Sequence, residues 1–415
     1  MLPQAFVLAA LSVYVPPEEV ARVAPVVVEG TVERTASGLD PETGRLATYV
    51  TLSVGRVLRG PRTWSTVVLR EPGGRFGDLE HALDAVPVYV AGERVVAFLE
   101  AAPDGALRTA HRFFGKFSFV DDALERDLSG QGLILRAPAE AERFSAHDLV
   151  ATVETNPYRP GGMPRLPLPV PPELDRVLWD PSTERLAPSG VANGSGGALD
   201  LAASPNGTGG IGLDFAPLNA STPVRWNESD SGSAVVVNIE PARNPLANAA
   251  SAVSEMKRAM TAWTNVPEAR VVLQSGNESY NFTGANAQGP ADAYPPTNII
   301  LFGDPYSDIT DPSGCSGTLA IGGYWNSGSA GTTVNNVTFR PALRLYVIFN
   351  NNFECFLGIA DNLAEVATHE LGHGLGYGHS AVADAVMRSS AYGGGRGPRL
   401  GNDDIDGAHC HYPHA

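Results

Sequence analysis

The sequence has little positive charge, few cysteines and no long hydrophobic run, and each shortage excludes a class of protein. Only 29 of its 415 residues are Lys or Arg, against 45 acidic residues, so the formal net charge is −16. Such a chain repels phosphate groups, which argues against a nucleic-acid binder and against a protein held on anionic membranes. The apolar run from Ala5 to Val15 is too short to cross a bilayer, and no other segment is long enough. We therefore expect no membrane span.

This short run near the N-terminus allows two interpretations. Residues 1–15 resemble the apolar core of a secretory signal, with Ala10-Leu11-Ser12 as a small-residue cleavage site. No Lys or Arg precedes the run, which is a departure from such signals. The alternative is a first β-strand. On the signal interpretation the protein is secreted, to the extracellular space or the periplasm.

The three cysteines allow one disulfide and one free thiol. Cys315 and Cys355 both precede a histidine-rich segment, so we pair them and leave Cys410 free. A disulfide fits an oxidising compartment. The alternative is three buried thiols.

The first half of the chain shows short alternating strands separated by turns. Runs rich in Val, Thr and Leu, bounded by Gly-Pro and Pro-Gly-Gly, predict strands at 26–32, 48–54, 66–69 and 94–99. We expect a small all-β domain over residues 16–140, a structural or binding module without visible chemistry. Residues 141–222 are rich in Pro and then in Gly, Ser and Asn, which predicts a linker.

From residue 223 the pattern changes to mixed strands and helices. A strand is expected at 234–239, and a helix from Ala249 to Trp263 has apolar residues at helical spacing. Further strands are expected at 270–273, 298–302, 318–321 and 345–349. The whole chain is thus expected to be multidomain, an N-terminal all-β domain followed by a C-terminal α/β (α+β) domain over 223–415 with one mixed sheet.

Histidine is distributed unevenly: none of the nine lies between His147 and His369, and six lie in the last 47 residues. Residues 362–380 read NLAEVATHELGHGLGYGHS, a helical segment that we expect Asp361 to cap. His369 and His373 are four residues apart and therefore project from one helix face, a spacing that suits one Zn²⁺. Glu370 can reach a metal-activated water as general base.

The chain can reverse at Gly376, in the left-handed conformation that ends a helix, and bring His379 back as a third ligand. Three neutral histidines leave a fourth position for water, which is typical of a catalytic zinc site rather than a closed structural one. The short HExxH pattern alone is weak, but the full HExxHxxGxxH fixes five positions. Alternatives are surface histidines on a glycine-rich turn and a degenerate structural zinc site.

Two further motifs follow the histidines. Met387 lies eight positions after His379, and Asn402 to Gly407 opens a final helix with acidic residues in its first turn. Together HELGHGLGYGHS (369–380), AVM (385–387) and DDIDG (403–407) resemble, in order and spacing, the matrixin-like branch of the metzincin metallopeptidases. The resemblance covers about residues 223–415. It implies a Met-turn, in which the Met387 thioether forms an apolar floor beneath the metal.

The resemblance also implies features that this sequence matches less well. Gly317 to Ala320 resembles the edge strand along which the family lays an extended peptide. Arg388-Ser389 replaces the Tyr-Pro that often follows the family's Met, which puts the specificity pocket in doubt. With no His from 148 to 368, a second, structural zinc is not expected. No Cys lies outside the peptidase region to block the metal, as the family's propeptide Cys does.

Two weaker metal patterns have ordinary alternatives. A structural Ca²⁺ is an option near Asp304, Asp308 and Asp311, where exposed loop carboxylates are the other interpretation. For His409, His411 and His414 we expect exposed side chains beside a buried Cys410 rather than a second metal site.

The function expected from the sequence is a secreted zinc endopeptidase. His369, His373 and His379 bind one catalytic Zn²⁺, Glu370 is the general base, and the partner is a protein or peptide substrate. We expect a monomer. The alternative is a catalytically inactive, zinc-stabilised binding or adhesion protein.

Overall fold

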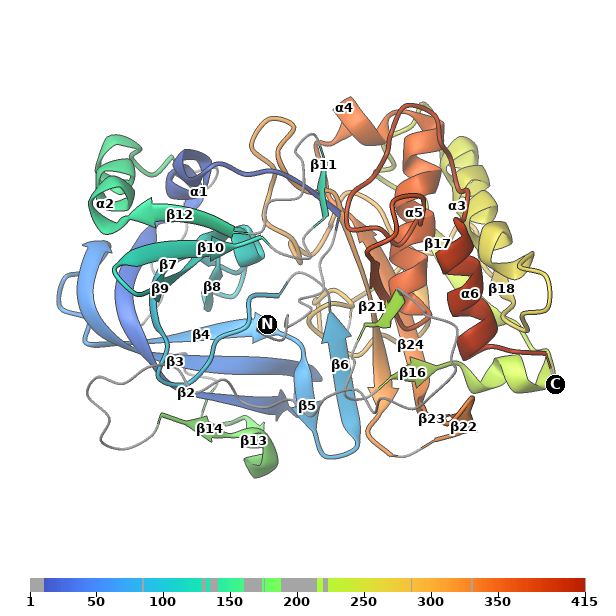
Figure 1. Ribbon diagram of the computed structural model, residues 1–415, viewed down its shortest axis with the longest axis horizontal. Coiled ribbons are helices and arrows are strands. Elements are labelled where there is room, and N and C mark those ends of the chain that lie inside the picture. Colours follow the sequence, from blue (N-terminus) through green and yellow to red (C-terminus); the bar gives the residue numbers. More distant parts are fainter. Residues whose placement is uncertain are drawn as a thin grey trace.

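The computed structural model has a β-rich half formed by the N-terminal residues and a second half of sheet and helices (Figure 1). The structure describes residues 11–83, 86–128, 132–134, 141–159, 174, 176–187, 215–218, 223–284, 286–329 and 331–414. The start of the expected signal and most of the expected linker lie outside these ranges. Within them, no helix is long and apolar enough to cross a membrane.

The N-terminal half is built on a closed ring of five strands. They are β2 (Val26–Asp40), β3 (Arg45–Arg59), β4 (Thr66–Pro72), β8 (Leu107–Thr109) and β7 (Arg94–Ala101). Each strand pairs with the next in that order, and β7 pairs back with β2, so the sheet closes into a barrel. Val and Leu side chains dominate its interior, and the sequence predicted four of the five strands, β2, β3, β4 and β7.

Additional elements extend this barrel beyond the expected boundaries. Strands β9 (Lys116–Val120), β10 (Ala123–Asp127) and β12 (Ala141–Ser145) continue its sheet, and helices α1 (Pro17–Val23) and α2 (Ala146–Thr155) accompany it. The expected all-β segment therefore contains a helix. Two short strands, β13 (Leu178–Trp179) and β14 (Arg185–Leu186), pair with β2, so part of the segment expected as a linker is regular structure.

The C-terminal half is a mixed sheet with helices, as expected. Its strand order is β18 (Leu273–Ser275), β17 (Val235–Glu240), β19 (Ile299–Leu301), β24 (Arg340–Phe349) and β21 (Ala320–Ser327). The first four are parallel, and β21 is antiparallel to β24. The strand expected at 270–273 begins only at Leu273, because the Arg270 amide donates to Tyr412 O instead of a neighbouring strand.

Two long helices cover one face of this sheet. Helix α3 (Ala249–Thr264) and helix α5 (Ala360–Gly374) pack against each other, and α5 lies against β21 and β24. Figure 1 shows α3, α5 and the final helix α6 (Asn402–His411) side by side on the outer side of the sheet. Apolar residues from α3, α5 and the strands form one core beneath them.

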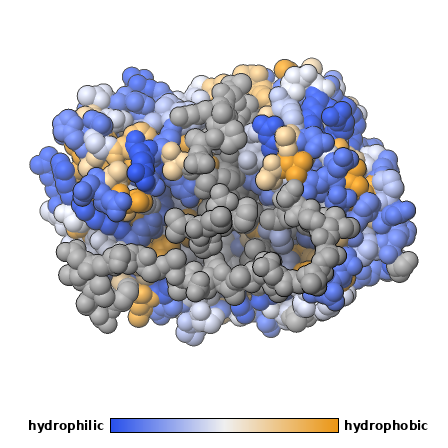
Figure 2. Space-filling view, viewed as in Figure 1, coloured by the Kyte–Doolittle hydropathy of each residue, from blue (hydrophilic) through white to orange (hydrophobic). Residues whose placement is uncertain are grey.

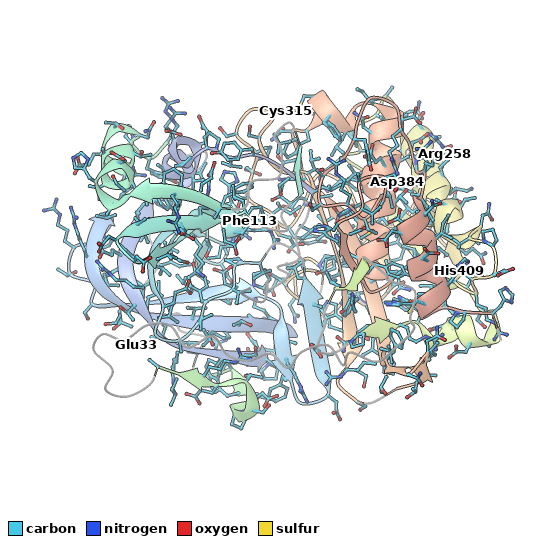
Figure 3. All side chains as sticks on the ribbon, viewed as in Figure 1. Glu33, Phe113, Arg258, Cys315, Asp384 and His409 are labelled. Carbon is cyan, nitrogen blue, oxygen red and sulfur yellow. A yellow bond between two sulfur atoms is a disulfide. The ribbon has the colours of Figure 1, made fainter. Side chains whose placement is uncertain are left out.

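The two halves are joined by paired strands and by a common core. The hairpin of β5 (Gly74–Phe76) and β6 (Leu79–Leu83) adds to the free edge of β21. A second core contains Phe98, Phe113 and Phe117 of the barrel together with Trp325 and Tyr346 of the sheet. Phe113 is labelled in Figure 3, on the side of the barrel that faces the sheet.

Strand β1 (Leu11–Val13) makes a further connection between the halves. It pairs with β11 (Gly132–Ile134) on one side and with β20 (Gly317–Thr318) on the other. The segment that allowed a signal or a strand interpretation thus contains a buried strand, and the signal itself stays a prediction.

The expected disulfide joins Cys315 to Cys355, and Cys410 is a free, partly buried thiol. Cys355 lies on the short helix α4 (Glu354–Leu357), just before α5. The disulfide therefore joins the loop before β20 to the segment just before α5. Most described side chains on the face seen in Figure 2 are hydrophilic, with scattered small apolar spots.

Candidate metal centre

Helix α5 positions the first two histidines through its apolar face. Leu363, Val366 and Leu371 are completely buried in the C-terminal core, which fixes the rotation of the helix. His369 and His373 then project together, one turn apart. Asp361 does not cap this helix: Ile359 is the N-cap residue, and Asp361 lies in the first turn.

Asp361 instead forms an ion pair with the preceding long helix. Arg258 Nη2 on α3 donates to Asp361 Oδ1 at 2.9 Å. Because both side chains are largely exposed, the pair contributes little to stability. It connects the middle of α3 to the start of α5.

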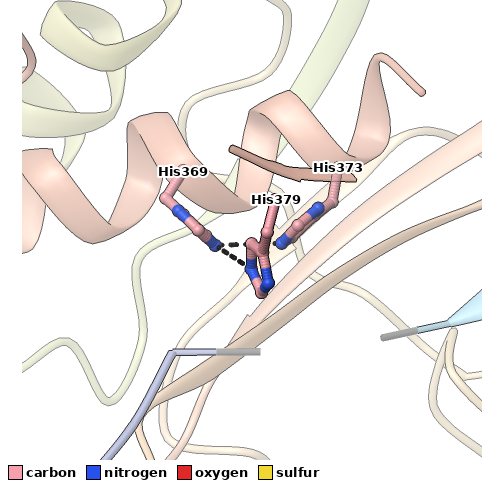
Figure 4. A group of neighbouring side chains, drawn as sticks. All are labelled: His369, His373 and His379. Atoms are coloured by element: carbon pink, nitrogen blue, oxygen red, sulfur yellow. Dashed lines mark hydrogen bonds between the residues drawn. The ribbon is translucent and has the colours of Figure 1, made fainter. Parts of the chain in front are cut away.

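A tight turn after α5 returns the third histidine. Gly376 has a φ of +102°, and a Cβ at this position would lie 2.4 Å from Val224 O, so only glycine fits. His379 follows on β25 (Tyr377–Ser380). The ligand nitrogens of His369, His373 and His379 all lie within 4.8 Å of one another (Figure 4), as the spacing predicted.

Hydrogen bonds to backbone carbonyls set the tautomers of two of these rings. His369 Nδ1 lies 2.8 Å from Val386 O, and His373 Nδ1 lies 2.8 Å from Tyr377 O. A carbonyl only accepts, so each Nδ1 carries the proton and each neutral Nε2 presents a lone pair to the centre. Burial and the neighbouring histidines lower the pKa of His369, which keeps this ring neutral.

The donor set fits a metal cation. His369 Nε2 is 2.9 Å from His373 Nε2 and 3.0 Å from His379 Nε2. Lone pairs this close repel each other unless a cation lies among them, and a tetrahedral zinc–imidazole centre separates its nitrogens by about 3.3 Å. Among the described residues, this is the group of three His, Cys, Asp or Glu side chains arranged to hold a metal.

Met387 packs directly beneath the histidine helix. A Cβ added to Gly372 would lie 2.2 Å from Met387 Sδ and 2.9 Å from the Trp263 ring, so the sulfur contacts the helix backbone. Gly372 lies between the two helix histidines in the sequence, so Met387 packs against the part of α5 that carries them, while its role as a floor beneath a metal stays a prediction.

Glu370 lies on the same helix between the two histidines and is completely buried. Its backbone contacts β21: a Cβ on Gly322 would be 2.2 Å from Glu370 O. Glu370, which is expected to act as general base, thus lies on the part of α5 whose backbone touches β21.

Comparison with known proteins agrees with this geometry. Residues 325–413 match the matrixin family. The C-terminal part of the chain thus resembles the matrixin-like metzincins. Metalloendoproteinase 5-MMP of Arabidopsis thaliana is 52% identical over 46 residues, 11% of this chain and 13% of that protein. Metalloendoproteinase 2-MMP of the same plant is 39% identical over 62 residues, 14% of this chain and 16% of that protein. The chain thus aligns with less than a fifth of each relative's length.

Asp404 supports the floor of the matrixin-like centre, a role that the sequence interpretation missed. Its carboxylate accepts hydrogen bonds from the backbone N–H groups of Val386 at 2.6 Å, Met387 at 3.0 Å and Gly401 at 2.6 Å. Val386 O in turn accepts from His369. Burial raises the pKa of Asp404 to about 6. The order of AVM and DDIDG was the available signal, but it was used only for the family resemblance, and the acidic residues were interpreted only as a favourable helix start.

The other predicted metal residues are less well grouped. Asp304 accepts from the amides of Asp308 at 2.9 Å and Ile309 at 2.8 Å, and burial raises its pKa to about 6. Asp311 accepts a hydrogen bond from the side chain of Asn351 at 2.8 Å. The positive charge of the nearby Arg108 opposes part of this rise in the pKa of Asp304. Calcium binding therefore stays a prediction.

The histidines of the last helix do not share one environment. His409 is partly exposed, and its Nε2 lies 2.5 Å from Pro267 O. His411 was expected to be exposed, but it is buried against the rings of Phe339 and Tyr377, because α6 turns this side chain toward the core. Burial lowers the pKa of His411 to about 3.

Proposed function

We propose that the protein is a secreted zinc-dependent endopeptidase. The observation that carries the proposal is the convergence of three histidine nitrogens on one point, with Glu370 between two of them on the same helix. The match of residues 325–413 to the matrixin family supports it. The substrate class is protein or peptide.

The side chains of the centre have separate tasks in peptide hydrolysis. His369, His373 and His379 would hold a zinc ion, which would supply a Lewis acid and lower the pKa of the attacking water. Glu370 takes a proton from the attacking water and delivers it to the leaving amine. The backbone carbonyls that accept from His369 and His373 keep both rings in the ligand tautomer while this happens.

Replacing Glu370 by Gln tests the proposal because it keeps the shape of the side chain and removes the base. We expect cleavage of casein to fall at least 100-fold, with one equivalent of zinc retained per chain by metal analysis. Glu354→Gln on the neighbouring helix α4, an exposed position, is the matched control and should keep full activity. Full activity of Glu370→Gln would refute the mechanism.

An inactive, zinc-stabilised binding protein gives a different pattern. Zinc would then raise the thermal stability of the chain, and no variant or treatment would produce cleavage.

The location of the protein is a separate part of the proposal. The Cys315–Cys355 disulfide supports an oxidising compartment, and fractionation of the producing cells tests it.

A further inference from the structure

The strand beside Glu370 has the position of a peptide-binding edge. Strand β21 touches α5 at Gly322, directly next to Glu370, and one of its edges pairs with β24. A substrate that adds to a sheet as an extended strand needs the other edge, where unpaired N–H and C=O groups provide the main-chain hydrogen bonds. The inference below rests on the proposed endopeptidase function.

N-terminal strands already occupy this other edge on both sides of Gly322. Strand β6 pairs with β21 from Leu83 opposite Gly323 to Leu79 opposite Ser327. On the other side, β1 pairs with β20, and the Leu319 amide donates to Leu11 O at 2.9 Å. Residues 320–326 are consequently all buried.

Side chains hold β6 in this position. The His81 ring stacks on Trp325 with 4.1 Å between ring centroids, and its Nε2 lies 2.7 Å from Tyr346 Oη. The preceding residue, Glu80, forms an ion pair with Arg340 of β24. His81, Trp325 and Tyr346 are buried, and Glu80 is buried as well, so its ion pair is screened less than one on the surface.

Strand β1 has a smaller anchor of the same kind. Ser12 Oγ donates to Thr318 Oγ1 at 3.2 Å, and both side chains are buried. Leu11 and Val13 on either side of Ser12 enter the C-terminal core. The N-terminal half therefore binds the edge with main-chain hydrogen bonds and with packed side chains, as a tightly bound peptide would.

We propose that the N-terminal half is an intramolecular inhibitor, whose strands β1 and β6 block the substrate edge next to Glu370. A peptide cannot form main-chain hydrogen bonds with groups that are already paired. The complete burial of His369, Glu370 and His373 agrees with a closed centre. The intact chain keeps only a low basal activity, which rises when β1 and β6 leave the edge.

Weakening the anchors of β6 in the full-length, zinc-loaded chain tests this inference. We expect His81→Ala and Glu80→Ala each to raise kcat/KM at least tenfold on a pool of quenched fluorescent peptides, because each lowers the free-energy difference between closed and open edges. Glu29→Ala is the matched control: it removes an ion pair with Arg94 on the same barrel, away from the edge, and should leave the rate unchanged.

A lock on β1 provides an opposite variant that does not depend on weakening the fold. Ser12→Cys with Thr318→Cys places two thiols where the hydroxyls now meet. Oxidation of this pair should lower peptide cleavage at least tenfold relative to the same protein after mild reduction. Wild type treated with the same reductant controls for the native disulfide.

Hydrogen exchange of the amides of residues 320–327 separates this inference from the proposed function. We expect exchange there to rise at least tenfold in His81→Ala and Glu80→Ala and to stay unchanged in Glu29→Ala. If the edge opens and no form cleaves peptide, the proposed function is wrong. If wild type cleaves as fast as the open and locked forms, the inhibitor inference is wrong while the function stands. Unchanged exchange in both β6 variants, with unchanged cleavage in the locked form, would also overturn it.

Discussion

Removing the Asp404 carboxylate should loosen the metal centre from a distance. In Asp404→Ala, three buried N–H groups lose their acceptor, including those of Val386 and Met387. An unsatisfied buried donor costs about 1–3 kcal/mol, so we expect a loss of roughly 3–5 kcal/mol in the free energy of unfolding after partial relaxation. The Val386 carbonyl that orients His369 shifts with this segment. Loss of such an outer contact typically lowers metal affinity about 10–100-fold.

Two assays measure the two effects. Urea unfolding gives the stability of Asp404→Ala, and competition with a chromophoric chelator gives its zinc affinity. Asp406→Ala, at an exposed position on the same helix, controls for the change of charge and helix propensity. If Asp404→Ala binds zinc like wild type, the carboxylate does not position the centre. If it also unfolds at the wild-type urea concentration, the hydrogen-bond argument itself is wrong.

Three other changes test the turn, the bridge and a buried ring. Gly376→Ala should lower stability by at least ~2 kcal/mol by urea unfolding, because its Cβ would meet Val224 O at 2.4 Å with φ at +102°; wild-type stability would contradict this geometry. Replacing Cys315 and Cys355 by Ser should cost about 4 kcal/mol, from the loop closed by a sequence separation of 40; a loss below ~1 kcal/mol would assign the loop's order to packing. Since the pKa of His411 is about 3 when folded and about 6.5 when unfolded, the unfolded state binds the proton first as pH falls, and stability declines below pH ~6.5. Between pH 7 and pH 5, His411→Gln should therefore lose about 2 kcal/mol less of its free energy of unfolding than wild type loses. An equal loss in the two proteins would show that the ring is not buried.

The sequence predicted those parts that depend on local patterns. The three histidines, Gly376 and Met387 lie within one short segment. The histidine nitrogens meet and Gly376 makes the turn, as predicted, and Met387 packs against the helix. The long barrel strands followed from alternation of Val and Leu. Asp361 was wrong as a cap because the helix begins two residues earlier than that role requires, and the Asp361 side chain pairs with Arg258 instead.

Contacts between distant segments could not be predicted in this way. Residues 79–83 have no alternating pattern, and β6 becomes a strand because β21 offers an edge. The burial of His411 and the role of Asp404 likewise depend on where α6 packs, which is decided by other segments. Local patterns thus predicted that the three histidines meet, but not which elements support and cover them.

The pairing of β6 with β21 joins two strands that the ribosome makes at different times. Residue 83 and residue 320 are 237 positions apart. At about 5–20 residues per second, the ribosome needs roughly 12–50 s to make the partner strand after the hairpin has emerged. During that interval the hairpin has an exposed edge, which invites pairing with other chains. The hairpin edge of the nascent protein is therefore expected to need protection until residue 327 has been made.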